Sequence, residues 1–154
     1  MTTSHSKVRV AVLGVGSLGK EHARIYSELA AGGHIEFAGV YDVSEEKAQK
    51  FAQKYQVRAF NSPAEAAAAA DALNIVTPTT THYDMARSLL EQGRHVLVEK
   101  PMTDNSAQAA HLVELALQKN CVLQVGHVER FNPIFKYLET AASQPRFIET
   151  HRLS

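Results

Sequence analysis

The sequence predicts an α/β fold in which a doubly wound parallel sheet forms a single domain. Short apolar segments of strand length alternate with longer segments of helical periodicity, and the connections between them are only a few residues long. A G-x-G-x-x-G pattern follows the first apolar segment. A chain of 154 residues has the usual size of one domain and is long enough to bury a core.

In the first half of the chain, each expected strand is followed by an expected helix. The first strand is apolar on both faces, as in a central parallel strand covered by helices. The helix after it has Leu18, His22, Ile25 and Leu29 at helical spacing. Ser44 is a suitable N-cap for the next helix. We expect strands at Lys7–Leu13, Ile35–Tyr41 and Val57–Phe60, and helices at Ser17–Ala31 and from Ser44 to about Tyr55.

The second half repeats the alternation. Ser62, Pro63 and Glu65 together indicate a helix start, with a cap, a proline suited to the first position and an acid that completes a capping box. The alanines that follow are strong helix formers. Further strands are expected at Ala72–Val76, His95–Val98 and Val122–Val125. Further helices are expected at His82–Gln92, from a cap at Asp104 or Ser106 to about Lys119, and from Phe131 to about Ala142, and the tail Arg146–Leu153 alternates enough to be a strand.

Composition excludes several classes of function. The 16 basic residues equal the 16 acidic ones, so no overall charge attracts nucleic acid or an anionic membrane. No apolar run reaches the roughly 18 residues of a membrane span, and the polar start, residues 1–6, is expected to be disordered. The single Cys121 and the spacing of the eight histidines offer no metal site. These features are typical of a cytoplasmic protein.

The glycine pattern predicts a dinucleotide-binding loop of the Rossmann type. Gly14 would make the tight turn out of the strand, Gly16 would let a pyrophosphate approach the backbone, and Gly19 would let the next helix pack close to the strand. The N–H groups from Ser17 and Leu18 onward would face the phosphates at the positive end of the helix.

Asp42 is the candidate for recognition of the adenosine ribose. It follows the second expected strand, 23 residues after Gly19, close to the usual spacing of about 20 for the ribose-binding acid. Its carboxylate would repel a 2′-phosphate, so NAD is favoured over NADP. Two alternatives remain open: Asp42 caps the helix near Ser44, or the glycine loop binds S-adenosylmethionine, which also places an adenosine against an acid.

Two further strand ends carry candidate residues. Thr77 and Pro78 are expected to line the cofactor, whereas Thr80 and Thr81 suit helix capping, and His82 is either a cofactor contact or structural. After the fifth strand comes Glu99-Lys100-Pro101. A lysine beside a nicotinamide ring could hydrogen-bond a substrate hydroxyl and help take its proton as hydride leaves. The alternative is a solvated lysine in a proline turn.

The run Gly126–Pro133 follows the sixth strand at the same edge. His127 could bind substrate or assist proton transfer, and Arg130 could meet an anionic substrate. The alternative is a loop in which Asn132 caps a helix and Arg130 pairs with Glu129 or Glu139.

These motifs together resemble the glucose-fructose oxidoreductase, inositol dehydrogenase and MocA (Gfo/Idh/MocA) family. The resemblance rests on the glycine loop, His22, Asp42, Thr77-Pro78, Glu99-Lys100-Pro101 and the Gly126–Pro133 run. It implies that Lys100 is a catalytic residue beside the nicotinamide, that the glycine-loop and strand-end residues, Glu99 included, bind NAD, and that the substrate is a sugar. The last run is similar to a branch that oxidises the 3-hydroxyl of UDP-N-acetylglucosamine or its relatives. A non-catalytic NAD(P)-binding sensor is the alternative function.

The family resemblance also implies a second, sheet-rich substrate domain. We expect the dinucleotide-binding domain to span residues 7–144 and residues 145–154 to begin the second domain, which would supply the acid/base partner and the oligomer contacts.

We therefore expect these 154 residues to bind NAD(H) without oxidising a sugar, because Lys100 lacks those catalytic partners. The measurement is absorbance at the NADH band during incubation with NAD and candidate sugars. Sugar-dependent formation of NADH would contradict the expectation.

Overall fold

The computed structural model describes residues 6–141, 144, 146, 147, 149 and 151 of the chain. Its centre is one parallel sheet of six strands, the doubly wound sheet predicted from the sequence, and the strand order is β3-β2-β1-β4-β5-β6. The strands are β1 (Arg9–Leu13), β2 (Glu36–Tyr41), β3 (Arg58–Ala59), β4 (Ala72–Ile75), β5 (His95–Val98) and β6 (Leu123–Val125).

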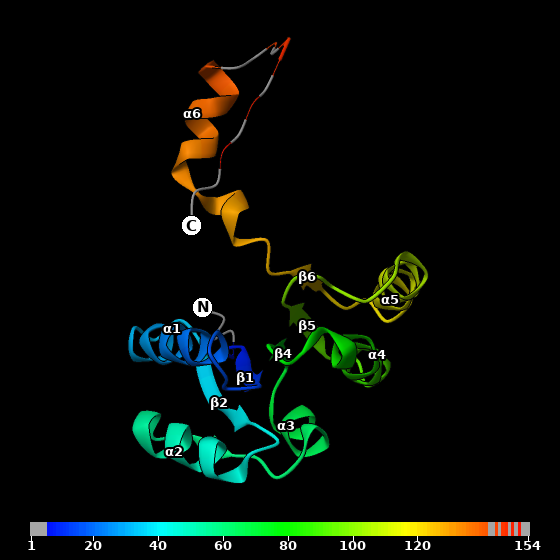
Figure 1. Cartoon of the computed structure of the whole chain (residues 1–154). Coiled ribbons are helices and arrows are strands. Elements are labelled where there is room, and N and C mark those ends of the chain that lie inside the picture. Colours follow the sequence, from blue (N-terminus) through cyan, green and yellow to red (C-terminus); the bar gives the residue numbers. More distant parts are fainter. Residues whose placement is uncertain (1–5, 142–143, 145, 148, 150, 152–154) are drawn as a thin grey trace, which may run out of the picture.

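Helices connect the strands and pack on both faces of the sheet (Figure 1). Two short 3-10 turns, η1 (Thr79–Thr81) and η2 (Val128–Phe131), follow the ends of β4 and β6. The helices are α1 (Gly19–Ala31), α2 (Glu45–Tyr55), α3 (Pro63–Ala69), α4 (His82–Glu91), α5 (Ser106–Gln118) and α6 (Pro133–Ala141).

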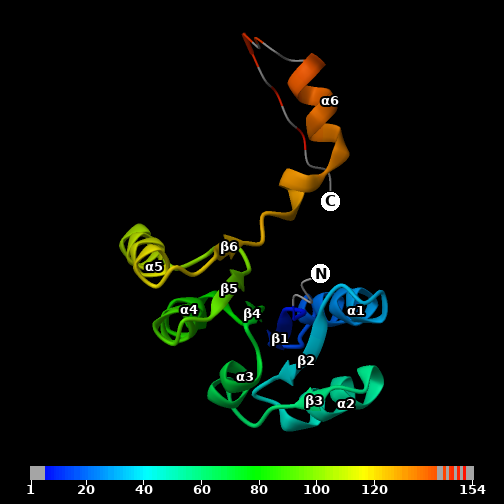
Figure 2. The same cartoon turned by 180° about the vertical axis from the view of Figure 1, so that it is seen from behind.

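Successive residues of the central strands point to opposite faces of the sheet and pack into two separate cores. Ala11 and Leu13 of β1 face a larger core with α3, α4 and α5, whereas Val12 faces a smaller core with α1 and α2. Figure 2 shows the same division from behind, with α1 and α2 on one side of the strands and α3, α4 and α5 on the other. Each fully buried leucine, isoleucine or valine contributes about 1.5–3 kcal/mol, so these two cores hold the layers together.

The buried stripe of α1 differs from the one expected. Leu18, Ile25 and Leu29 are 48%, 44% and 37% exposed, whereas His22 of the expected set does point inward, beside the buried Gly19 and Ala23. The reason is that a glycine at the first helical position brings the helix against the strand ends, which selects the small-residue face for the interior. The helix also begins at Gly19 instead of Ser17, because residues 16–18 form the turn.

Two of the capping contacts predicted from the sequence are present in the structure, and two differ from the prediction. Ser44 and Ser62 accept hydrogen bonds from the N–H groups of Lys47 and Glu65, as predicted. The Glu65 carboxylate, however, receives the N–H of Asn61 and not that of Ser62. The cap of α5 is neither Asp104 nor Ser106 but the residue between them, Asn105, whose Oδ1 accepts from Gln108 N–H at 3.0 Å.

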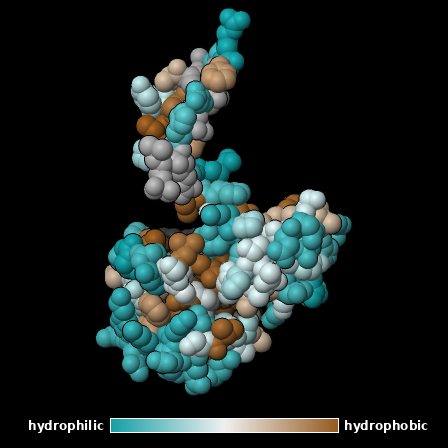
Figure 3. All heavy atoms as spheres, in the orientation of Figure 1, coloured by the Kyte–Doolittle hydropathy of each residue, from teal (hydrophilic) through white to brown (hydrophobic). Residues whose placement is uncertain are grey.

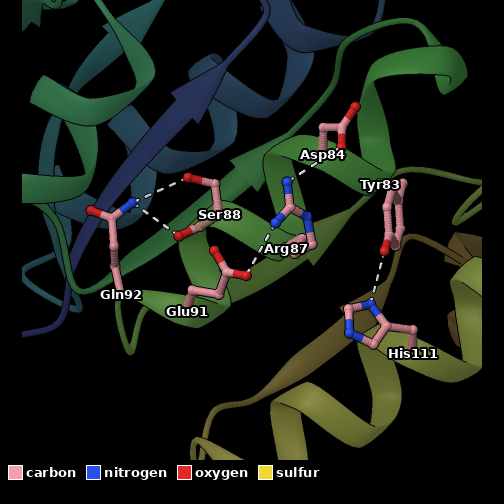
Figure 4. Close-up of polar contacts among 7 residues, drawn as sticks. All are labelled: Tyr83, Asp84, Arg87, Ser88, Glu91, Gln92 and His111. Carbon is pink, nitrogen blue, oxygen red and sulfur yellow. Dashed lines mark hydrogen bonds and ion pairs between the residues drawn. The ribbon is translucent and has the colours of Figure 1, made fainter.

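The outer face of α4 is polar (Figure 4). Arg87 pairs with Glu91 one turn later at 3.2 Å, and Tyr83 bridges to the neighbouring helix α5 through His111 Nδ1 at 2.9 Å. Surface pairs of this kind contribute little stability each. Asp84, Ser88 and Glu91 are exposed, so this face of α4 points to solvent.

Helix α6 stands clear of the sheet and its covering helices in both cartoon views. Its large apolar side chains are exposed: Ile134, Phe135, Tyr137 and Leu138 lie between 44% and 65% exposed. In the space-filling view, most of the surface over the sheet and its covering helices is polar (Figure 3). Apolar surface shows in the centre of this part and on the segment that contains α6. The strand expected at Arg146–Leu153 lies partly outside the described residues, and the described ones among them are not in a strand.

Over the described part of the chain, no helix combines the length and the apolar character needed to cross a bilayer.

The amino ends of β1 and β4 are joined by a bidentate ion pair. Arg9 Nη2 and Nε lie 2.6 and 3.1 Å from the two carboxylate oxygens of Asp71, and the Arg9 N–H adds a bond of 3.0 Å. The side-chain hydrogen bond from Arg9, more than any other contact, lowers the pKa of Asp71 from its ordinary 3.8 to about 2. A carboxyl whose pKa is lowered in the folded state stabilises the fold above its unfolded pKa and loses this contribution as pH falls toward 2.

We predict that Asp71→Asn destabilises the chain by about 1 kcal/mol at pH 6, a value reduced for the partial exposure of the pair. The difference from the wild type should shrink below pH 4 and fall to about half at pH 3, as measured by urea unfolding. Asp104→Asn, at an exposed acid, is the matched control. A difference that stays constant from pH 6 to pH 3 would contradict the prediction.

Candidate functional site

The carboxyl ends of β1, β2 and β4 surround a cavity of about 230 Å³. This is the edge at which ligands bind in open parallel sheets. Its lining comes from the three strand ends and from the start of α4: Gly14, Gly16, Tyr41, Asp42, Val43, Val76, Thr77, Pro78, Thr81 and Met85. Five residues expected to bind the cofactor, Gly14, Gly16, Asp42, Thr77 and Pro78, are thus brought together.

The glycine loop is shaped by two close backbone contacts. Gly14 has φ +93°, and a Cβ there would lie 2.5 Å from the carbonyl oxygen of Val76. A Cβ at Gly19 would overlap the carbonyl of Gly14. Both positions therefore admit only glycine, Gly14 for the turn and Gly19 for the close approach of α1.

Gly16 differs, because a Cβ there would meet no atom within 4 Å. The loop is open on this side. Among the described residues, the N–H groups of Gly16, Ser17 and Leu18 donate to no acceptor, and they precede the N-terminus of a 13-residue helix. Free N–H groups at a helix N-terminus form an anion site, so the loop fits a pyrophosphate.

Asp42 is joined to the glycine loop. Its Oδ2 accepts the N–H of Val15 at 2.9 Å and its Oδ1 accepts the N–H of Ser44, also at 2.9 Å. The bond to Ser44 closes a turn before α2, whose cap is Ser44 itself, so Asp42 does not cap the helix, and it has a place in the cavity wall. A carboxylate has about four lone-pair sites, so each oxygen can still accept a ribose hydroxyl.

Thr77 and Pro78 line the cavity, but His82 does not. Thr77 Oγ1 is 2.7 Å from Thr81 Oγ1, which in turn donates to the carbonyl of Pro78 at 2.8 Å. His82 is 1% exposed, and both of its ring nitrogens lie against backbone carbonyls. Its ring is therefore occupied inside the protein, as in the structural role left open from the sequence, and a contact between His82 and the cofactor stays a prediction.

Lys100 opens onto a second and larger cavity of about 590 Å³. The wall opposite includes Phe135 and Glu139 of α6, and the remainder comes from the end of β6 and η2: Gly126, His127, Val128, Glu129 and Arg130. All three residues expected to contact substrate, Lys100, His127 and Arg130, line this one cavity. The cavity therefore lies between the ends of β5 and β6 and helix α6.

Glu99 points the other way. Its side chain is buried, 3.0 Å from His22 Nε2, and its second oxygen accepts the N–H of Lys100 at 3.2 Å. The Glu99 carboxylate is therefore used inside the fold, and the expected contact between Glu99 and the cofactor stays a prediction.

The alternative role weighed for the 126–133 run holds only in part. Asn132 Oδ1 accepts the N–H of Ile134 at 3.1 Å near the start of α6, as a capping residue would. Arg130, however, makes no ion pair with Glu129 or Glu139 among the described residues, so its guanidinium is available to the cavity.

Several lining residues were not expected from the sequence. Met85 lies one helical turn after Thr81, a spacing that could have indicated it. Tyr41, Val43 and Phe135 gave no signal, because apolar residues at strand and helix ends are ordinary. Asn74, which lines neither cavity, did give a signal in the sequence. It is a polar residue in the middle of the apolar strand β4, and it is completely buried. No cluster of three or more metal-ligating side chains occurs in the described part of the chain.

Comparison with known proteins agrees with this geometry. Residues 8–127 match the model of a family described as an oxidoreductase family with an NAD-binding Rossmann fold, Gfo/Idh/MocA. The chain is 38% identical over 148 residues to a UDP-N-acetylglucosamine 3-dehydrogenase of Acidithiobacillus ferrooxidans, covering 96% of this chain and 46% of that protein. It is 33% identical over 132 residues to a scyllo-inositol 2-dehydrogenase (NAD(+)) of Bacillus subtilis, covering 84% and 38%.

Solved structures give the same result. A structure of the Acidithiobacillus ferrooxidans enzyme superposes with a TM-score of 0.81 at 37% identity, covering 89% of this chain and 44% of that one. A structure of GenD2 from gentamicin A biosynthesis in complex with NAD superposes with a TM-score of 0.83 at 28% identity, covering 91% and 40%. The chain thus spans less than half the length of these relatives. With the family model matched over most of its length, this chain belongs to the Gfo/Idh/MocA oxidoreductase family and carries its NAD-binding Rossmann domain.

Proposed function

We propose that residues 7–144 form the cofactor domain of an NAD-dependent dehydrogenase that oxidises a hydroxyl of a sugar or nucleotide sugar. The observation that carries the proposal is the position of Lys100. It lies at the sheet edge that also bears the glycine loop, and it faces the 590 Å³ cavity and not bulk solvent alone. A cavity beside a dinucleotide loop, with one amine in its wall, suits removal of a hydride and a proton from an alcohol.

The cofactor proposed is NAD in preference to NADP. The wall of the cavity at the end of β2 carries Asp42, and Glu45 and Glu46 follow in the first turn of α2. A 2′-phosphate at this place would meet like charges, whereas ribose hydroxyls could donate to Asp42. Glu45 and Glu46 also offset the partial positive charge at the N-terminus of α2, so this end of the helix does not attract a phosphate.

The residues divide the chemistry as follows. Bound NAD⁺ would accept the hydride from the substrate carbon. Lys100, as the neutral amine, would hydrogen-bond the substrate hydroxyl and take its proton, so the alcohol leaves as a ketone. The N–H groups of residues 16–18 would hold the pyrophosphate, and Asp42 the ribose.

The substrate proposed is a sugar with an anionic group, such as a UDP-N-acetylhexosamine oxidised at its 3-hydroxyl. The similarity to the UDP-N-acetylglucosamine 3-dehydrogenase supports it. So does Arg130, whose guanidinium lies in the wall of the cavity, makes no ion pair within the described part of the chain and has the fork of donors that binds a phosphate in a bidentate manner. His127 lies beside it and could donate a further hydrogen bond.

The proposal is tested by titrating the chain with NADH, NADPH and S-adenosylmethionine in a calorimeter. We expect NADH to bind at least tenfold more tightly than NADPH, a difference of about 1.4 kcal/mol, and S-adenosylmethionine to give no signal. Tight binding of S-adenosylmethionine without binding of NADH would overturn the proposal.

Two glycine variants separate binding from folding. Gly16→Ala should leave the unfolding midpoint unchanged, because its Cβ meets open space, and should weaken NADH binding about tenfold by blocking the pyrophosphate. Gly19→Ala should instead lower the unfolding midpoint, because its Cβ overlaps the Gly14 carbonyl. Thermal unfolding and NADH titration of both variants give the comparison. A Gly16→Ala protein that binds NADH as well as the wild type would contradict the placement of the pyrophosphate.

A further inference from the structure

Lys100 stands between two residues that the interior of the protein holds in place. On one side, the side chain of Glu99 is only 6% exposed. On the other, the carbonyl of Pro101 is bound by a buried histidine ring. The proposed chemistry needs the amine of Lys100 and uses neither neighbour, so these contacts require their own explanation.

The first contact is a chain of three buried or half-buried side chains. Asn74 Nδ2 lies 2.6 Å from His22 Nδ1, and His22 Nε2 lies 3.0 Å from Glu99 Oε1. Because the amide of Asn74 donates to Nδ1, the ring carries its proton on Nε2 and donates it to the carboxylate. The second carboxylate oxygen then accepts the N–H of Lys100. The chain therefore runs from the middle of β4 to the backbone of the lysine.

The carboxylate of Glu99 lies directly against the backbone of Gly126. A Cβ at Gly126, at the end of β6, would lie 2.6 Å from Glu99 Oε1. The absence of a side chain at residue 126 thus leaves the space that the carboxylate fills. A buried carboxylate without hydrogen bonds costs several kcal/mol, so the bonds from His22 and Lys100 fix its position.

The second contact is the ring of His82, the first residue of α4. Its Nδ1 lies 2.9 Å from the carbonyl oxygen of Pro101 and its Nε2 lies 2.8 Å from that of Thr77. A carbonyl can only accept, so both bonds are made together by a ring that carries a proton on each nitrogen, and a neutral ring makes one of them. The ring joins the segment after β5 to the end of β4.

Each histidine comes from an element that begins at the dinucleotide cavity. His22 lies in α1, one turn after Gly19, and His82 follows the Thr77–Thr81 segment that lines the cavity. The two contacts therefore connect the backbone on either side of Lys100 to the two segments that would enclose the cofactor.

We propose that His22, through Glu99, and His82, through the carbonyl of Pro101, are positioning residues that hold the Lys100 backbone in register with the cofactor loops. The role of the lysine amine itself rests on the proposed function. The two histidines touch neither reacting atom: they act by fixing where the lysine side chain leaves the sheet edge.

The first test uses the free wild-type protein and is independent of any cofactor. In ¹⁵N-labelled protein at neutral pH, His22 and His82 should each give an imidazole N–H signal, because a hydrogen-bonded ring proton inside the protein exchanges slowly with water. The exposed rings of His34 and His127 should give none. If the signals of His22 and His82 are also absent, the proposed hydrogen bonds are not present and the inference is wrong.

The second test removes each ring. His22→Leu and His82→Leu should shift the backbone amide signal of Lys100, and NADH should no longer change the signal of its εCH₂ group. Binding of ADP-ribose, which lacks the nicotinamide, should stay within about twofold of the wild type. His22→Gln and His82→Gln, which keep one donor, should restore part of the NADH-induced change. His111→Leu, at an exposed ring on α5, is the control and should leave Lys100 unchanged.

The outcomes separate the two proposals. Lys100 signals that remain those of the wild type in both leucine variants, with and without NADH, would overturn the positioning role. If a leucine variant does not fold, the glutamine variants decide: one donor should restore the contacts only in part, so Lys100 signals identical to those of the wild type in both glutamine variants also overturn the positioning role. If the wild type does not bind NADH, the proposed function fails. The positioning role is then still tested by whether the Lys100 amide signal shifts in the leucine variants without NADH.

Discussion

The contact between Gly19 and the carbonyl of Gly14 is the constraint on which the arrangement of the site depends. It sets the first turn of α1 directly against the end of β1, at a distance that no side chain allows. From that position the helix points its N-terminus at the sheet edge and brings His22, one turn later, within 3.0 Å of Glu99. The glycine loop and the Glu99-Lys100-Pro101 segment lie some 80 residues apart in the chain, and helix α1 fixes them relative to each other.

Much of the fold could be predicted, because parallel strands and helices differ in the period of their apolar residues. Strand β5 was predicted to the residue, and the alternation of the six strands with the six α-helices was predicted in its order, although the two 3-10 turns were not. The face of α1 could not be predicted. Leu18, Ile25 and Leu29 form a good apolar stripe, but the backbone contact at Gly19 outweighs side-chain hydrophobicity and turns Ala23 inward instead. The cap at Asn105 was missed because three adjacent residues have side chains that can accept the same N–H groups.

For the candidate site, the sequence indicated which residues reach the sheet edge but not which way their side chains turn. Position follows from topology, since every parallel strand ends at the same edge. Direction depends on partners that are distant in sequence, as with Glu99, which pairs with His22, and His82, which spans two carbonyls. The polar Asn74 within β4 was the one visible sign that a hydrogen-bond chain crosses the interior.

The walls of the larger cavity come from two different parts of the structure. Lys100 and Gly126 are attached to the sheet, whereas Phe135 and Glu139 belong to α6, which stands apart from the covering helices. In the proposed function, the residues that would hold the cofactor and those that would contact the substrate therefore line separate cavities. Since no residue of the glycine loop lines the larger cavity, a change in the position of α6 relative to the sheet would alter this cavity and leave the glycine loop as it is.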